Sequence, residues 1–106
     1  MGAPPGYPAP VAEAWSIYVL ACGDGSLYTG IALDVSARFD AHERGQGARY
    51  TRGRGPLELL AKARIGERGE ALSIEYAFKQ LSRPEKDAIL ARPRGLVGFV
   101  RRTRSV

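Results

Sequence analysis

Residues 15–32 decide the fold, and they read WSIYVLACGDGSLYTGIA. Two apolar, β-prone runs, 15–22 and 27–32, flank a Gly-Asp-Gly-Ser segment whose composition is typical of a turn. The pattern predicts an antiparallel β-hairpin. Tyr18 and Tyr28 each lie within one of its two strands.

A helix, a basic loop and a third strand are predicted after the hairpin. A good N-capping aspartate precedes a helix predicted over residues 35–44. Arg38 and His42 share one face of that helix because they are four residues apart. Residues 45–55 are rich in Gly and Arg and predict a loop, whereas the apolar segment 57–65 predicts the third strand.

Two further helices are predicted, over residues 68–81 and 83–91. In the first, apolar side chains form a stripe that faces a core, and Glu75 lies at the edge of that stripe. The second begins in Ser-Arg-Pro-Glu at residues 82–85, which has the spacing of a capping box, and it ends before Pro93.

These elements predict an α/β fold of the α+β type, with a small, mostly antiparallel three-stranded sheet flanked by helices. A chain of 106 residues suffices for one compact domain, which we expect over residues 15–92. Residues 1–14 are rich in proline and are expected to be a flexible leader. Residues 93–106 are expected to be a basic tail, part of which could dock through the apolar residues between 96 and 100.

The net charge of +5 is unevenly distributed. Residues 44–54 and 92–104 contain no acidic residue and hold nine of the sixteen basic ones, so the rest of the chain is net negative. Guanidinium groups match phosphate oxygens and release counterions when they dock, so this pattern favours a nucleic-acid surface. The alternative is a solvated surface in an arginine-rich chain.

Several classes of protein are disfavoured by the composition. The chain has no run of 18 apolar residues and no recognisable secretory signal, so we expect a protein of the cytoplasm that does not enter a membrane. Its single cysteine, Cys22, cannot form an internal disulfide, and one Cys with one His cannot build a structural zinc site. No obligate protein partner is evident.

The motifs occur in a recognisable order: Ser16-Ile17-Tyr18, Tyr28-Thr29-Gly30, the Arg-x-x-x-His spacing from Arg38 to His42, and Ile74-Glu75-Tyr76. In order and spacing the chain resembles the GIY-YIG endonuclease superfamily, and most of all its small stand-alone bacterial members. Two departures are visible: Ser16 and Thr29 replace the glycine and isoleucine of the name motifs, and the chain contains no asparagine, which many members carry after the glutamate helix.

The resemblance implies a metal-dependent endonuclease that hydrolyses DNA phosphodiester bonds, by nicking or structure-specific cleavage, in DNA repair or processing. The catalytic residues that it implies are Tyr18, Tyr28, Arg38, His42 and Glu75. The partner is DNA, with RNA not excluded. The alternative, which stays open, is a nucleic-acid-binding module with the nuclease fold but negligible catalysis. A third interpretation, an arginine-rich domain that binds a protein, has no motif of its own.

Physical roles follow from the chemistry of these side chains. Glu75 would hold Mg²⁺, or Mn²⁺, because one carboxylate suffices when substrate phosphate and waters complete the octahedron; its structural alternative is an ion pair with Lys79. Arg38 could pair with the scissile phosphate, and His42 could orient water, assist proton transfer or contact phosphate. Tyr28 is assigned the general-base or water-orienting role and Tyr18 the supporting one, although the reverse assignment stays open.

Further contacts with nucleic acid are expected from the basic loop and from the end of the glutamate helix. Tyr50 could stack on a base, and the loop cations could meet phosphates. The expected nucleic-acid-binding residues are Arg49, Tyr50, Thr51, Arg52, Arg54 and Lys79.

Overall fold

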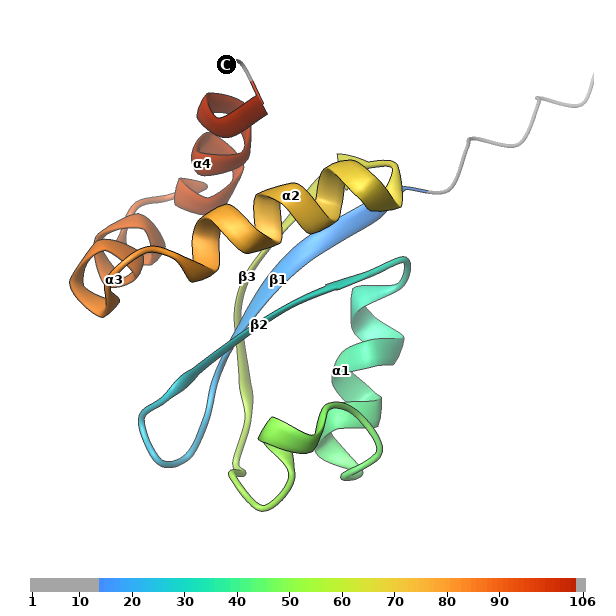
Figure 1. The fold of residues 1–106 in the computed structure, drawn as a ribbon. Coiled ribbons are helices and arrows are strands. Elements are labelled where there is room, and N and C mark those ends of the chain that lie inside the picture. Colours follow the sequence, from blue (N-terminus) through green and yellow to red (C-terminus); the bar gives the residue numbers. More distant parts are fainter. Residues whose placement is uncertain (1–13, 105–106) are drawn as a thin grey trace, which may run out of the picture.

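The computed structural model describes residues 14–104 and contains three strands, four α-helices and one short 3-10 turn (Figure 1). In chain order the elements are β1 (Trp15–Ala21), β2 (Leu27–Ala32), α1 (Val35–Glu43), η1 (Arg49–Thr51), β3 (Glu58–Gly66), α2 (Arg68–Lys79), α3 (Arg83–Ala91) and α4 (Gly95–Arg104). No helix in this part of the chain has the length and apolarity needed to cross a membrane.

The sheet has the strand order β2-β1-β3, and both pairings are antiparallel. The central strand aligns Tyr18 with Gly30 on one side and with Lys62 on the other. The predicted hairpin, the antiparallel three-stranded sheet and the α+β class are therefore confirmed. Because β1 is in the middle, β2 and β3 each keep one edge without a partner strand in this sheet.

The two faces of the sheet are covered by different helices (Figure 1). Ile17 and Val19 of β1 lie in a core cluster with residues of α2 and α4. Tyr18 and Leu20 alternate with them and lie in a second cluster that includes Val35 of α1. Since successive side chains of a strand point to opposite faces, α1 covers one face and α2 with α4 covers the other.

Local signals in the sequence set the helix starts. The Asp34 side chain accepts a hydrogen bond of 3.0 Å from the Ala37 amide, as expected of an N-cap. Ser82 and Glu85 form the predicted capping box at the start of α3. The basic loop is less irregular than expected, because residues 49–51 form a turn of 3-10 helix with Thr51 buried.

The C-terminal segment corrects one expectation. Residues 95–104, predicted to belong to a basic tail, form α4, and Leu96, Phe99 and Val100 are buried in the core cluster. The Phe99 ring meets Phe78 of α2 edge to face, with centroids 5.4 Å apart. These apolar positions have the i, i+3, i+4 spacing of one helix face, which the surrounding arginines obscured. The expected leader lies, except for Ala14, outside the described residues, as do residues 105 and 106.

Candidate active site

A buried hydrogen bond joins the centre of the sheet to α1. The Tyr18 hydroxyl oxygen lies 2.7 Å from His42 Nε2, and both side chains are almost completely inaccessible to solvent. Tyr18 comes from the middle of β1 and His42 from the last turn of α1. The pairing satisfies two polar groups in an otherwise apolar layer, and it fixes both rings.

The other nitrogen of His42 is held by the basic loop. The Ala48 amide donates to His42 Nδ1 at 3.2 Å. The single hydroxyl hydrogen of Thr51 lies between two acceptors, Nδ1 at 2.8 Å and the Ala48 carbonyl oxygen at 2.9 Å. Because an amide can only donate, Nδ1 presents its lone pair, and the neutral ring then carries its proton on Nε2, facing Tyr18.

Two glycines make room for this cluster. A Cβ on Gly30, the cross-strand neighbour of Tyr18, would lie 2.6 Å from the Tyr18 hydroxyl. A Cβ on Gly47 would meet His42 Nδ1 even more closely. The glycine of the Tyr-Thr-Gly motif therefore lets the phenol of Tyr18 reach across β2, and Gly47 lets the loop close over His42.

The electrostatics of the pair favour the uncharged forms. Burial, and then the neighbouring Tyr28, raise the pKa of Tyr18 from 10.0 to about 12, against the lowering influence of Arg38. Burial, and then the positive charge of Arg38, lower the pKa of His42 below its ordinary 6.5. At neutral pH the site therefore contains a protonated phenol beside a neutral imidazole.

Tyr28 is the more accessible of the two motif tyrosines. Its ring centroid lies 6.3 Å from that of Tyr18 and 5.1 Å from that of His42, which it meets edge-on. The Tyr50 ring stacks beside it at 6.0 Å. Tyr28 is half-buried and Tyr50 is exposed, so the aromatic cluster runs from the buried Tyr18 outwards to solvent.

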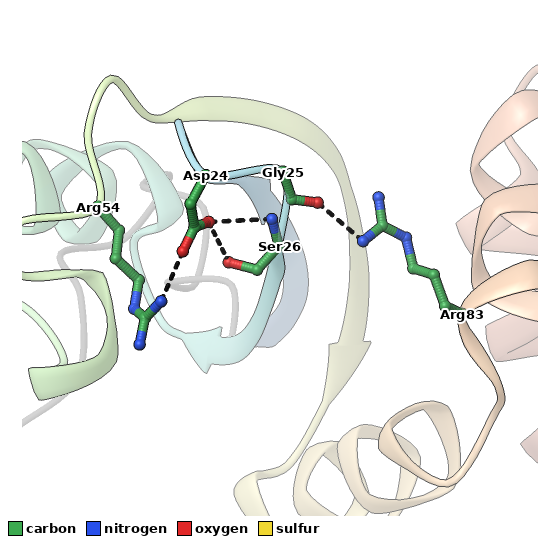
Figure 2. Close-up of polar contacts among 5 residues, drawn as sticks. All are labelled: Asp24, Gly25, Ser26, Arg54 and Arg83. Carbon is green, nitrogen blue, oxygen red and sulfur yellow. Dashed lines mark hydrogen bonds and ion pairs between the residues drawn. The ribbon is translucent and has the colours of Figure 1, made fainter.

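The hairpin turn anchors the basic loop beside this cluster (Figure 2). The Asp24 carboxylate accepts hydrogen bonds from the Ser26 amide and hydroxyl and pairs with Arg54 at 2.6 Å. The Arg54 guanidinium also lies 4.2 Å from the centre of the Tyr50 ring. From the other side, Arg83 at the start of α3 donates to the Gly25 carbonyl oxygen at 2.8 Å.

Glu75 belongs to the helix layer on the other face of the sheet. It lies on α2, its side chain is 16% exposed, and its carboxylate is 3.3 Å from Lys79 Nζ. That ion pair is the structural alternative raised by the sequence. Both α2 and α1 contact β2. Glu75 is therefore carried by the helix on the face of the sheet opposite to α1, the helix that carries His42.

The arrangement allows a metal ion that is shared with a substrate, but no site made by protein alone. Among the described residues, no group of three or more His, Cys, Asp and Glu side chains could hold an ion. Glu75 offers hard oxygen donors of the kind that Mg²⁺ prefers, and Mg²⁺ keeps much of its water shell. A single carboxylate therefore fits an ion whose other ligands are water and phosphate.

The structure gathers some of the predicted site residues and separates others. Tyr18, Tyr28 and His42 form one cluster with Tyr50 and Thr51 beside it. The exposed Arg38 acts on that cluster through its charge. Lys79 is paired with Glu75 on α2, and Arg54 is engaged by Asp24. Arg49 and Arg52 are exposed on the loop.

Sequence reasoning missed the roles of three residues: Asp24, Gly30 and Gly47. The sequence around Asp24 indicates only a turn, and no local pattern predicts its hydrogen bond to a residue 30 positions away. The steric roles of Gly30 and Gly47 depend on side chains from other elements.

The three-stranded sheet, the tyrosines on two adjacent strands and the histidine on the following helix form a small α+β domain that fits the order of motifs in the sequence. Comparison with known families agrees: the model described as the GIY-YIG catalytic domain matches residues 14–88. The chain therefore belongs to the GIY-YIG family, which the motifs suggested. Its family is one of nucleases that generally depend on a divalent metal.

The relatives are small proteins of comparable length. A UPF0213 protein of Cronobacter sakazakii is 47% identical over 79 residues, covering 74% of this chain and 83% of the relative. A UPF0213 protein of Nitratidesulfovibrio vulgaris is also 47% identical over 79 residues, covering 74% and 72%. The solution NMR structure of a UPF0213 protein from Bacillus halodurans is 44% identical, with a TM-score of 0.49, and covers 74% of this chain and 83% of that one.

Proposed function

We propose that this protein is a metal-dependent endonuclease that hydrolyses DNA phosphodiester bonds at the edge of β2. The observation that carries the proposal is the buried hydrogen bond between Tyr18 and His42, with the half-buried Tyr28 packed against both rings. A phenol and an imidazole fixed in this way are costly to bury for packing alone, because each polar group needs a partner.

Tyr28 is the candidate general base or water-orienting group. It is accessible, whereas Tyr18 is buried and its raised pKa of about 12 makes it a poor base. His42 donates its Nε2 proton to the Tyr18 oxygen in a hydrogen bond, so Tyr18 keeps its own phenol proton to donate towards Tyr28. Tyr18 and His42 thus position Tyr28 and its hydrogen-bond network.

Arg38 is the candidate phosphate ligand. It is exposed on α1, one turn before His42, and its charge is felt by both Tyr18 and His42. Its guanidinium can donate a bidentate, charge-assisted pair of hydrogen bonds to the scissile phosphate. The resulting neutralisation of the phosphate lowers the barrier to attack by water.

Glu75 is the candidate metal ligand. When bound, Mg²⁺ or Mn²⁺ would stabilise negative charge on the phosphate and on the leaving oxygen. The remaining work falls to the protein: the aromatic cluster excludes bulk water from one side of β2, and Lys79 holds the Glu75 carboxylate in place until substrate arrives. Lys79 then becomes available to the same phosphate.

The substrate follows from the number of sites. Residues 14–104 carry one such cluster, so unless the protein dimerises it cuts one strand per encounter and acts by nicking or by structure-specific cleavage. A role in DNA repair or processing in the cytoplasm is consistent with this chemistry and with an exposed basic loop, in which Arg49 and Arg52 can meet phosphates.

The decisive experiment is a cleavage screen. End-labelled single-stranded, duplex, flap, junction and RNA substrates are incubated with the protein in Mg²⁺, in Mn²⁺ and in chelator. We expect metal-dependent nicking of at least one DNA structure. The second candidate, a binding module without turnover, is favoured by the absence of asparagine from the chain and predicts salt-sensitive binding without cleavage of any substrate under any metal condition.

A further inference from the structure

Three adjoining hollows run from the junction of β2 and α1, across β3, to the corner between α3 and α4. Their volumes are about 670, 340 and 330 Å³. Lys62 and Val97 line both the first and the second hollow, whereas Arg92 and Arg94 line both the second and the third. The hollows therefore form one continuous depression, which we call the β3-edge groove.

The groove is strongly cationic. Its basic side chains are Lys62, Arg64, Arg92, Arg94 and Arg102. All five residues are exposed, and within residues 14–104 none of them is joined to an acidic side chain by an ion pair. The one acidic residue that lines the groove in this part of the chain, Asp34, uses a carboxylate oxygen to cap α1.

One of these arginines is held in an unfavourable backbone conformation. Arg94 has φ of 54°, which lies in the left-handed region that is unfavourable for a residue with a Cβ. The next residue must be glycine, because a Cβ on Gly95 would clash with the Ile89 carbonyl oxygen. A glycine would also suit position 94, yet the chain carries an arginine that lines two of the hollows.

The second and third hollows lie away from the candidate active site, whereas the first extends to the junction of β2 and α1. The Tyr18 hydroxyl reaches across Gly30 on β2, whereas Lys62 is the partner of Tyr18 on β3, the other edge strand. Neighbouring strands are about 4.8 Å apart, so the backbones of the two edge strands are separated by roughly 10 Å. A ligand in the second and third hollows therefore leaves the β2 edge open.

We propose that the β3-edge groove is a second nucleic-acid-binding surface, which holds the phosphate backbone of a duplex arm of the substrate while the cleaved strand lies at the β2 edge. The proposal rests on the proposed function, because it gives the groove the same substrate. The groove suits phosphates in sequence: its cations are spread along its length, and guanidinium forks pair with phosphate oxygens.

A protein partner or a membrane fits the groove less well than nucleic acid does. A protein interface needs an apolar centre, and a membrane-binding surface needs apolar side chains that enter the lipid. The large apolar side chains exposed along the groove are Leu33, at 47%, and Leu60, at 39%. The five exposed cations outnumber them.

The test uses fluorescence anisotropy on a three-way-junction DNA and on a single-stranded oligonucleotide too short to span both edges. The Lys62→Gln/Arg64→Gln variant is compared with Arg68→Gln/Lys86→Gln, which removes two positive charges outside the groove. We expect the groove variant to bind the junction roughly tenfold more weakly at low salt, with a salt dependence shallower by about two counterions. It should bind the short oligonucleotide like wild type, and the control should change neither ligand.

A second variant separates binding from folding. Arg94→Gly removes a charge and relieves the left-handed backbone, so it should weaken junction binding while keeping or raising the melting temperature. Wild-type junction affinity and salt dependence in both groove variants would overturn the proposal. So would stronger competition by polyglutamate or by phosphatidylglycerol vesicles than by duplex DNA of equal charge.

The two proposals fail in different ways. Metal-dependent cleavage of the short oligonucleotide, together with groove variants that bind the junction normally, would retain the nuclease and reject the groove. Groove-dependent junction binding by a protein that cleaves no substrate would retain the groove and reject the nuclease.

Discussion

The Tyr18 hydroxyl lies 2.7 Å from His42 Nε2, in a layer from which solvent is almost completely excluded. This contact joins the central strand of the sheet to the end of α1, and through Ala48 and Thr51 it reaches the basic loop. The same hydrogen bond therefore has two roles. Its structural role is to satisfy buried polar groups, and its proposed functional role is to hold the phenol beside Tyr28.

The structural role of this hydrogen bond can be measured with Tyr18→Phe, His42→Ala and the double variant. Removing His42 leaves the buried phenol without its partner, so we expect a loss of about 1–3 kcal/mol in the free energy of unfolding. In the double variant the losses should fall short of additivity by about 1 kcal/mol, measured by urea unfolding. Strict additivity would mean that the two side chains do not interact in solution.

Stability should also depend on pH through this pair. The pKa of His42 is lowered in the folded state, so the unfolded chain binds the proton more readily, and stability that is complete above about pH 6.5 should fall as the pH drops below that value. The pKa of Tyr18 is raised to about 12, so its contribution should be complete below pH 10 and lost between pH 10 and about 12. Urea unfolding at pH 5, 7 and 11 checks both directions.

Arg38→Ala provides the electrostatic control for that experiment. Arg38 is the second cause, after burial, of the lowered pKa of His42. Its removal should raise this pKa towards 6.5 without reaching it, as followed by the imidazole proton resonances of the single histidine. An unchanged pKa would place Arg38 too far from His42 in solution to act on the site.

Much of the fold could be predicted because its signals are local. The hairpin announces itself by two apolar runs around turn residues, and the capping box of Ser82 and Glu85 marks the start of α3. Helix α4 was not predicted, because Leu96, Phe99 and Val100 are interspersed with glycine and arginine in the sequence. Its helical conformation depends on packing against α2 and β3.

The motifs name the candidate site residues, but not how the fold arranges them. They single out Tyr18, Tyr28, His42 and Glu75, yet no sequence pattern shows that α2, which carries Glu75, covers the face of the sheet opposite to α1. The ion pair of Arg54 could not be predicted from the sequence either. Its charge suggested phosphate, but the structure pairs it with Asp24 across 30 residues, which is a long-range outcome of how the hairpin turn meets the loop.

Gly30→Ala tests the close approach of Tyr18 to β2. The new methyl would lie 2.6 Å from the Tyr18 hydroxyl, and the buried ring has little space to retreat. We expect a loss of about 1–3 kcal/mol in unfolding free energy and displacement of the hydroxyl from His42. Gly69→Ala on α2, where nothing lies within 4 Å, should be neutral or mildly stabilising. Equal melting temperatures for the two variants would contradict the steric role.

Arg49→Ala combined with Arg52→Ala tests the basic loop as a docking surface. Both residues are exposed beside the aromatic cluster. Because they should meet phosphates and not base edges, binding to many DNA sequences should weaken alike, and the salt dependence should flatten by about two counterions. Affinity is measured over a salt series, with Arg68→Ala/Lys86→Ala as the charge-matched control. A sequence-selective loss would indicate base contacts instead.

Glu75→Gln and Tyr28→Phe together test the catalytic assignment. The glutamine keeps the shape of the glutamate but lacks the charge that would hold Mg²⁺, so metal-dependent cleavage should fall at least about a hundredfold, or roughly 3 kcal/mol of barrier. Phenylalanine keeps the packing of Tyr28 against His42 and deletes only the hydroxyl, so the loss of cleavage activity should be comparable while DNA affinity stays near wild type.

A different result is expected if Glu75 is only a surface charge paired with Lys79. Removing that negative charge would then tighten DNA binding and leave cleavage unchanged, and Tyr28→Phe would have no effect. Wild-type cleavage and metal dependence in both variants would rule out the mechanism proposed for this site.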